Sequence, residues 1–327
     1  MDHWQRIEAA IAGDTADRVP VALWRHFPLD DQDPGRLAAL TLEWQRAWDF
    51  DLVKFMPSGT YSVEDWGARS VYERNFNGAR VIAAPGVQRV GDWRRLPRLD
   101  PKQGVLGAQN EALARAAKEL RGAVPILQTV FSPLTTARKL AGDALLGQLR
   151  SDPGALEAGL RTITDTTIDF SLAALEAGAH GLFFATQLAT TDVLTVAEYE
   201  RFGRKFDLEV FSAVQGKAKM NMLHLHGENV MFDLLASYPA QMINWHDRLT
   251  APTLKNALNK FKGAVVGGVE ERELLLSGDE RTVRAQVREA IGQTGGRRLV
   301  VGPGCVAAIA APEHNIRAVI EEARRAT

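Results

Sequence analysis

The sequence has few of the features that mark secreted, membrane-spanning or disulfide-stabilised proteins. Its 327 residues include one cysteine, which excludes an internal disulfide framework and favours a reducing compartment. No apolar run approaches the ~18 residues that a transmembrane helix needs. The N-terminal stretch is amphipathic and charged and lacks an apolar core, so we expect no signal peptide and a cytoplasmic location.

An excess of charge of one sign is also absent. The 39 Lys and Arg residues nearly balance the 40 Asp and Glu residues, and they form neither a basic stripe nor an acidic tail. Nucleic acid and anionic membranes are therefore excluded as the main partners, and we expect a small-molecule substrate. No Ser/Gly tract or charge block divides the chain, so residues 1–327 are expected to form a single domain.

The chain does contain a series of short apolar runs rich in β-branched residues. Several are apolar on both faces, as the strands of a buried parallel sheet are. The eight runs span residues 18–25, 51–58, 123–130, 181–187, 220–227, 242–247, 264–270 and 298–305. Helical periodicity is clearest over residues 34–48, 154–178, 195–216 and 280–296.

Eight strands that alternate with helices predict an α/β fold, a single distorted (β/α)8 TIM barrel; the alternative is an open doubly wound sheet. One connection, residues 59–122, is too long for a single βα unit. Part of it, roughly residues 69–95, predicts a hairpin inserted after the second strand, with a turn near the sequence NFNGAR.

In a barrel, catalytic groups gather at the C-terminal ends of the strands, and polar residues stand at most of the predicted ends. They are Arg25, His26, Ser58, Thr129, Thr186, Gln187, His224, His226, His246, Asp247, Glu270 and Cys305.

Two of these histidines, His224 and His226, are two residues apart and share one face of a strand. With Cys305 they would offer two imidazoles and one thiolate, a ligand set suited to zinc. Three protein ligands leave a fourth position open, which is typical of catalytic zinc rather than structural zinc. The alternative is that all three are hydrogen-bonded or inert core residues.

Several segments in this order resemble the uroporphyrinogen decarboxylase superfamily, which includes zinc-dependent methyltransferases that carry methyl groups from corrinoids to thiols. They are RVPVALWRHF, EDWGA, FSPLTTARKLAG, LEAGAHGLFFATQ, LTVAEYERFGRKF, LHLHGENV, INWHD, VVGGVE and GPGCVAAIAAPEHNIRAV. The resemblance covers most of the chain, and it implies a distorted (β/α)8 barrel.

The decarboxylase branch of that family differs from this chain at its tetrapyrrole-binding positions. Arg25 matches the first of two arginines in the opening loop, but Leu29 stands at the second. Ser58 lies near the place of an aspartate that binds pyrrole N–H groups, and Cys305 replaces a late histidine. The resemblance therefore implies a pocket poorly suited to a macrocycle with eight carboxylates.

The methyltransferase branch, in contrast, carries zinc on His-x-Cys and on a second cysteine about eighty residues later. Here His224 matches the histidine, His226 stands at the first cysteine and Cys305 at the second, 79 residues beyond His226. The resemblance implies zinc at these three residues and a thiol acceptor. It also implies a corrinoid donor on a separate carrier protein, because the chain has no DxHxxG corrinoid motif.

The resemblance also assigns roles to the remaining strand-end residues. Arg25 and His26 would bind an acidic group or take part in catalysis, while Asp247 or Glu270 would act as a fourth ligand or a base. Ser58, Thr129, Thr186, Gln187 and His246 are expected to bind substrate.

Two other functions stay open from the sequence. One is a metal-independent carboxy-lyase that acts on a tetrapyrrole or a smaller carboxylated substrate, and the other is a non-catalytic binding protein on the same barrel. A homodimer is a further expectation, with Trp44, Trp48 or Trp93 at an interface or, as core residues, within the fold.

Overall fold

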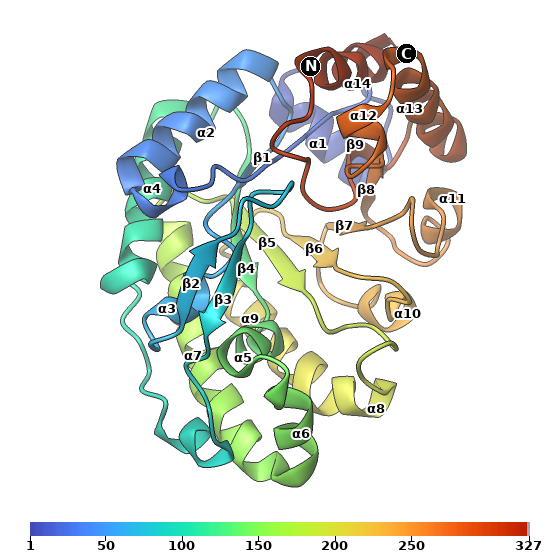
Figure 1. Ribbon diagram of the computed structural model, residues 1–327. Coiled ribbons are helices and arrows are strands. Elements are labelled where there is room, and N and C mark those ends of the chain that lie inside the picture. Colours follow the sequence, from blue (N-terminus) through green and yellow to red (C-terminus); the bar gives the residue numbers. More distant parts are fainter. Residues whose placement is uncertain (326–327) are drawn as a thin grey trace.

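The computed structural model describes residues 1–325, and its centre is a parallel β-sheet of seven strands. The strand order is β1-β4-β5-β6-β7-β8-β9, so strands that follow one another along the chain are neighbours once the hairpin β2–β3 is set aside. Figure 1 shows the curled sheet in the middle of the molecule, with helices outside it. The strands of this sheet are β1 (Val53–Phe55), β4 (Ile126–Phe131), β5 (Gly181–Thr186), β6 (Met222–Leu225), β7 (Met242–Trp245), β8 (Ala264–Val269) and β9 (Leu299–Pro303).

Every residue in these seven strands is buried. Burial on both faces explains why most strand residues are apolar and why polar and apolar residues do not alternate regularly. Seven of the eight predicted runs are therefore confirmed as strands of one parallel sheet.

The prediction of a strand over residues 18–25 was wrong in its extent. Only Val21 forms a bridge, to Val301 of β9. Pro20 has no N–H to donate, and the N–H of Val21 donates to the side-chain Oδ2 of Asp51 at 3.0 Å instead of to a strand. The segment still links the edges of the sheet, because Ala22 donates to the carbonyl of Val301 and Val21 accepts from the N–H of Asp51, each at 2.9 Å.

The helices lie outside the sheet, and α2, α7 and α13 match the predicted periodicity. Helix α4 (Gly104–Leu120) was not predicted, and the predicted helix over residues 195–216 is divided into α8 and α9. Helix α2 starts at Pro34, where the Asp33 side chain accepts from the N–H of Arg36, so the prediction over residues 34–48 is confirmed. Along residues 1–325 no helix is both long enough and apolar enough to cross a bilayer. The α-helices are α1 (His3–Ala12), α2 (Pro34–Trp48), α3 (Tyr61–Glu64), α4 (Gly104–Leu120), α5 (Pro133–Ala141), α6 (Ala144–Ser151), α7 (Pro153–Glu176), α8 (Val196–Tyr199), α9 (Lys205–Val214), α10 (Phe232–Leu235), α11 (Leu254–Ala257), α12 (Leu274–Ser277), α13 (Glu280–Thr294) and α14 (Glu313–Arg325).

An antiparallel hairpin separates β1 from β4 along the chain. It pairs β2 (Arg69–Tyr72) with β3 (Arg80–Ala84), and its turn packs on the loop that follows β9. The carbonyl of Phe76 accepts from the N–H of Ile309 at 2.9 Å. Gly78 has a φ of +78°, and a Cβ there would come within 2.8 Å of Ile309 and 3.0 Å of His26, so the turn requires glycine.

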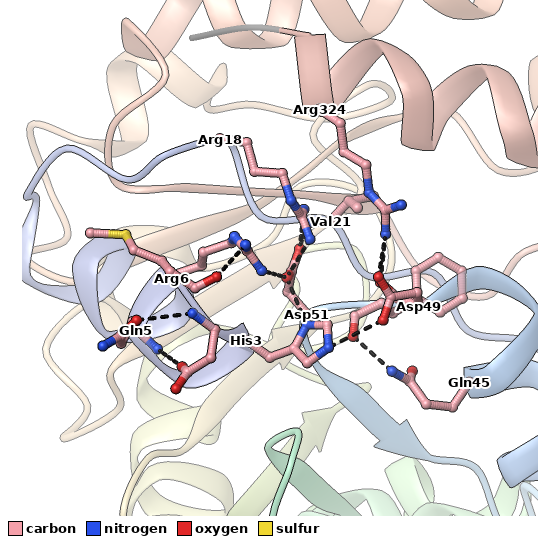
Figure 2. Close-up of polar contacts among 12 residues, drawn as sticks. His3, Gln5, Arg6, Arg18, Val21, Gln45, Asp49, Asp51 and Arg324 are labelled. Carbon is pink, nitrogen blue, oxygen red and sulfur yellow. Dashed lines mark hydrogen bonds and ion pairs between the residues drawn. The ribbon is translucent and has the colours of Figure 1, made fainter.

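A charged network around Asp51 holds the N-terminal ends of the strands together (Figure 2). The fully buried Asp51 carboxylate accepts two hydrogen bonds from Arg18, at 2.7 and 2.9 Å, and further bonds from Arg6 and His3. Burial alone would raise the pKa of Asp51, but the hydrogen bond from His3, the charge of Arg18 and the N–H of Val21 together lower it. The network thus ties α1 and the segment at Val21 to the start of β1.

Replacement of Asp51 by asparagine is expected to lower the free energy of unfolding at pH 7 by about 3 kcal/mol, because it removes a fully buried carboxylate and leaves the partly buried Arg18 without its counter-ion. The contribution of Asp51 is present above its unfolded pKa of about 3.9 and is lost as the pH falls through its lower folded pKa. Urea unfolding at pH 7 and near pH 3 should therefore show a difference between variant and wild type that shrinks in acid. The control Asp49→Asn removes an exposed partner of Arg324 and should cost much less.

Candidate metal centre

Four side chains with metal-binding atoms meet at the C-terminal ends of β6, β7 and β9. They are His224 in β6, His226 just beyond it, His246 just after β7, and Cys305 two residues after β9. One ligand atom from each lies within 4.8 Å of the others. The structure thus brings together the three residues expected to hold a metal, and it adds His246, which the sequence placed among substrate-binding residues.

The ring of His224 is oriented by Asn244 on the neighbouring strand β7. The Asn244 amide nitrogen donates to the carbonyls of Val266 and Pro303, at 2.8 and 3.0 Å, so its Oδ1 is an acceptor. This oxygen lies 2.6 Å from Nδ1 of His224, which therefore carries the proton. The lone pair of His224 is then on Nε2 and is available to a metal.

His246 is oriented by the buried carboxylate of Glu271. Nδ1 of His246 lies 2.9 Å from Oε1 of Glu271, and Nε2 lies 3.3 Å from Nδ1 of His226. The other oxygen of Glu271 accepts from the N–H of Gly304 at 3.1 Å, next to Cys305 in the chain. One carboxylate therefore fixes both His246 and the backbone that presents Cys305.

The electrostatics of the cluster favour a thiolate at Cys305. Burial opposes ionisation, but contacts with His224, His226 and His246 lower the pKa of the Cys305 thiol well below its ordinary value. Its sulfur lies 3.6 Å from Nδ1 of His226. A thiolate among three imidazoles, two of them fixed by neighbouring acceptors, fits the donor preferences of Zn²⁺.

A cavity of about 120 Å³ lies beside the cluster. Residues of the sheet, of the hairpin and of the loop after β9 contribute to its wall. The lining residues include His26, Lys54, Thr129, Lys139, Gln187, His224, His226 and Cys305. Burial lowers the pKa of His26 to about 3, with nearby Lys54 acting in the same direction, so His26 is a neutral imidazole in this wall.

Three of the proposed catalytic residues lie outside this cavity. The Arg25 guanidinium stacks on Trp44, 4.6 Å from the ring centroid, and donates to the carbonyl of Ile309. Asp247 accepts from the N–H of Gly268 and pairs with Arg248. Glu270 accepts three backbone N–H groups at the start of α12, so it acts as a cap rather than a ligand.

Of the residues expected to bind substrate, some line the cavity and others lie outside it. Thr129 and Gln187 line the cavity, although the Thr129 hydroxyl donates to the carbonyl of Phe55. Ser58 is 3.0 Å from the Thr60 hydroxyl, and the Thr186 hydroxyl donates to the carbonyl of His224. Ser58 therefore stabilises the loop after β1, and Thr186 links β5 to β6.

Four residues of the site were missed from the sequence: Asn244, Glu271, Lys54 and Lys139. The sequence analysis chose Glu270, which is next to Glu271 in the chain. The direction of the turn after β8 determines which of the two carboxylates reaches His246. Lys54 could have been found from the sequence, because it is a cation within the apolar run predicted as a buried strand.

The family model described as uroporphyrinogen decarboxylase (URO-D) matches residues 2–326. The chain belongs to the uroporphyrinogen decarboxylase family. Its similarity to a uroporphyrinogen decarboxylase of Rhodococcus opacus is 32% identity over 151 residues, which is 44% of this chain and 41% of that protein.

Relatives that are named as methyltransferases match over a longer part of the chain. The methylcobamide:CoM methyltransferase MtaA of Methanosarcina barkeri is 24% identical over 80% of this chain and 72% of its own length. The methylcobamide:CoM methyltransferase MtbA of Methanosarcina acetivorans is 20% identical over 73% of this chain and 69% of its own length. The solved structure of a methyltransferase from Methanosarcina mazei superimposes with a TM-score of 0.87, 20% identity and 99% coverage of both chains, which shows a shared fold.

Proposed function

We propose that this URO-D family protein transfers a methyl or other alkyl group from a corrinoid donor to a small thiol, with zinc held by His224, His226 and Cys305. The observation that carries the proposal is the meeting of these three ligand atoms, with that of His246, at one edge of the sheet. The chain resembles named methylcobamide:CoM methyltransferases over most of its length, which supports the same chemistry. In this proposal the segment at Val21 completes the sheet as an eighth, minimal strand of a distorted barrel.

Zinc at this site would stabilise the thiolate of a substrate thiol and so supply a nucleophile at neutral pH. The thiol proton would pass to solvent, the substrate sulfur would form a bond to the methyl carbon, and the carbon–cobalt bond of the donor would break with its electron pair left on the donor. Asn244 and Glu271 keep His224 and His246 in fixed orientations throughout. The hairpin turn, packed on Ile309, contributes Asn77, Ala79 and Arg80 to the wall of the cavity.

The size of the cavity supports a small acceptor. A volume of about 120 Å³ is below the ~300 Å³ at which pockets for drug-sized ligands begin. A tetrapyrrole is larger than such ligands. The donor, carried by a separate protein, would therefore present its methyl group at the mouth.

The experiment is methyl transfer from methylcobalamin to 3-sulfanylpropanoate, followed through the visible absorbance of the donor. We expect turnover by the zinc-loaded protein, loss of turnover after chelation and recovery when zinc is returned. Absence of zinc uptake after loading would contradict the proposal.

A metal-independent carboxy-lyase is the second candidate, favoured by the 32% identity to the Rhodococcus enzyme. It predicts release of CO₂ from a carboxylated substrate at the same rate before and after chelation. The same protein samples therefore separate the two functions.

A further inference from the structure

A second cavity, of about 210 Å³, lies between α2 and the start of α14, and we call it the α2–α14 groove. It shares no lining residue with the cavity beside the His/Cys cluster. A ligand in this groove would therefore leave the proposed metal centre unoccupied. The charged and aromatic lining residues of the groove are Arg25, Glu43, Glu313, Phe27, Trp44 and Trp48.

Arg25 is the cation of this groove, and it forms no ion pair with any of residues 1–325. Its Nη1 donates to the carbonyl of Ile309 at 2.9 Å, but its buried Nε has no hydrogen-bond partner within the same part of the chain. The guanidinium lies 4.6 Å from the ring centroid of Trp44 and 5.5 Å from that of Phe27, so two aromatic rings hold it in place. Burial lowers the pKa of Arg25, and no carboxylate acts in the opposite direction. A fixed guanidinium with free N–H groups is a preformed partner for a carboxylate.

Two glutamates give the same groove negative charge. Glu43 on α2 and Glu313 at the start of α14 are exposed, and neither side chain has a hydrogen-bond or ion-pair partner among residues 1–325. The lining residues thus carry one positive and two negative charges, none of them paired with another. A ligand with charge of only one sign would be attracted by one of these groups and repelled by the other. A ligand with both signs of charge can pair with both.

The rest of the wall is aliphatic and aromatic, with Leu40 and Ile316 beside the tryptophans. The indole N–H of Trp44 donates to the carbonyl of Leu23 at 3.1 Å, so it is already used within the fold. Such a wall suits methylene groups rather than further polar groups. The volume of about 210 Å³ is below the ~300 Å³ at which pockets for drug-sized ligands begin. The groove therefore fits a small ligand with an aliphatic body.

We propose that the α2–α14 groove binds a small aliphatic zwitterion of the amino acid class. Arg25 binds the carboxylate of this ligand, and Glu43 and Glu313 bind its ammonium group. Arg25, a candidate for catalysis from the sequence, thus belongs to a second binding site. This site contains no residue of the proposed metal centre, so it does not depend on zinc or on the proposed function.

Calorimetry on the full chain without added zinc tests the groove with ω-amino acids from glycine to 6-aminohexanoate. The member that binds most tightly reports the spacing between the two charged ends. It should bind about 10- to 100-fold more tightly than the carboxylic acid or the amine of the same chain length, because each of these lacks one set of charge-assisted hydrogen bonds. Absence of saturable binding by every member would overturn the site. Equal affinity for the amino acid and the simple acid would overturn it as well.

Variants then assign the two ends of the ligand. Arg25→Gln should abolish binding, and Arg25→Lys should weaken it, because an ammonium lacks the planar fork of a guanidinium. The double variant Glu43→Gln with Glu313→Gln should weaken binding of the amino acid without weakening binding of the simple acid.

The glutamates are exposed, so the double variant should fold as wild type does and tests the site even if the Arg25 variants fail to fold. Glu8→Gln, at an exposed position on α1, is the matched control and should keep the affinity of wild type. Amino acid binding that is unchanged in the double variant would contradict the proposal.

Discussion

Replacement of Cys305 by alanine is expected to abolish zinc binding, from about one ion per chain in the zinc-loaded wild type to a trace. Cys305 is the only cysteine in the chain, so no other thiolate can take its place. The His226→Ala variant should lose zinc as well, because its Nδ1 lies between His246 and Cys305. Elemental analysis of the purified proteins after zinc loading and desalting measures both losses.

His314→Ala is the matched control, because His314 is exposed on α14 and outside the cluster. It should retain the zinc content of wild type. Cobalt substitution adds a spectroscopic readout, since the thiolate-to-cobalt charge-transfer band should be present in wild type and His314→Ala and absent in Cys305→Ala. Full zinc content in Cys305→Ala would contradict the site and leave Cys305 as a partly buried thiol without a metal.

The same measurement on His246→Ala defines the fourth position. In the proposed function this position is open to substrate, so the variant should keep most of its zinc. A loss as complete as that of Cys305→Ala would make His246 a fourth protein ligand, and the site would then be a closed, structural one.

Much of the fold was predictable because buried parallel strands have a strong sequence signal. Short apolar runs rich in β-branched residues marked all seven strands of the sheet, and helical periodicity marked α2. The prediction of a first strand over residues 18–25 was wrong for a local reason. Its apolar pattern is that of a strand, but Pro20 and the hydrogen bond from Val21 to Asp51 leave it a single bridge.

The part of the site that lies at the ends of the strands was predictable from the sequence. His224, His226 and Cys305 could be chosen because the C-terminal ends of parallel strands meet at one edge. Beyond a strand, the direction of each side chain depends on the turn, and there the prediction failed. Glu270 caps α12 while Glu271 reaches His246, a difference of one residue that no periodicity encodes.

Replacement of Asn244 by leucine is expected to weaken zinc affinity about 10- to 100-fold, the usual effect of removing the partner of a metal-binding histidine. The Asn244 amide is fixed by the carbonyls of Val266 and Pro303, and its Oδ1 holds the proton of His224 on Nδ1. Leucine has a similar volume and no acceptor, so the imidazole loses both its preferred tautomer and its fixed orientation. Competition with a chromophoric zinc chelator measures the change.

Two further variants separate this effect from a general loss of stability. Asn315 is also fully buried and donates to two carbonyls, of Leu275 and Gly278, but it is not one of the residues around the cluster. Asn315→Leu should therefore lower the free energy of unfolding without changing zinc affinity. Asn244→Asp keeps an oxygen acceptor for Nδ1 of His224 and should retain most of the affinity. Wild-type affinity in Asn244→Leu would show instead that stacking on Phe183 is enough to orient His224.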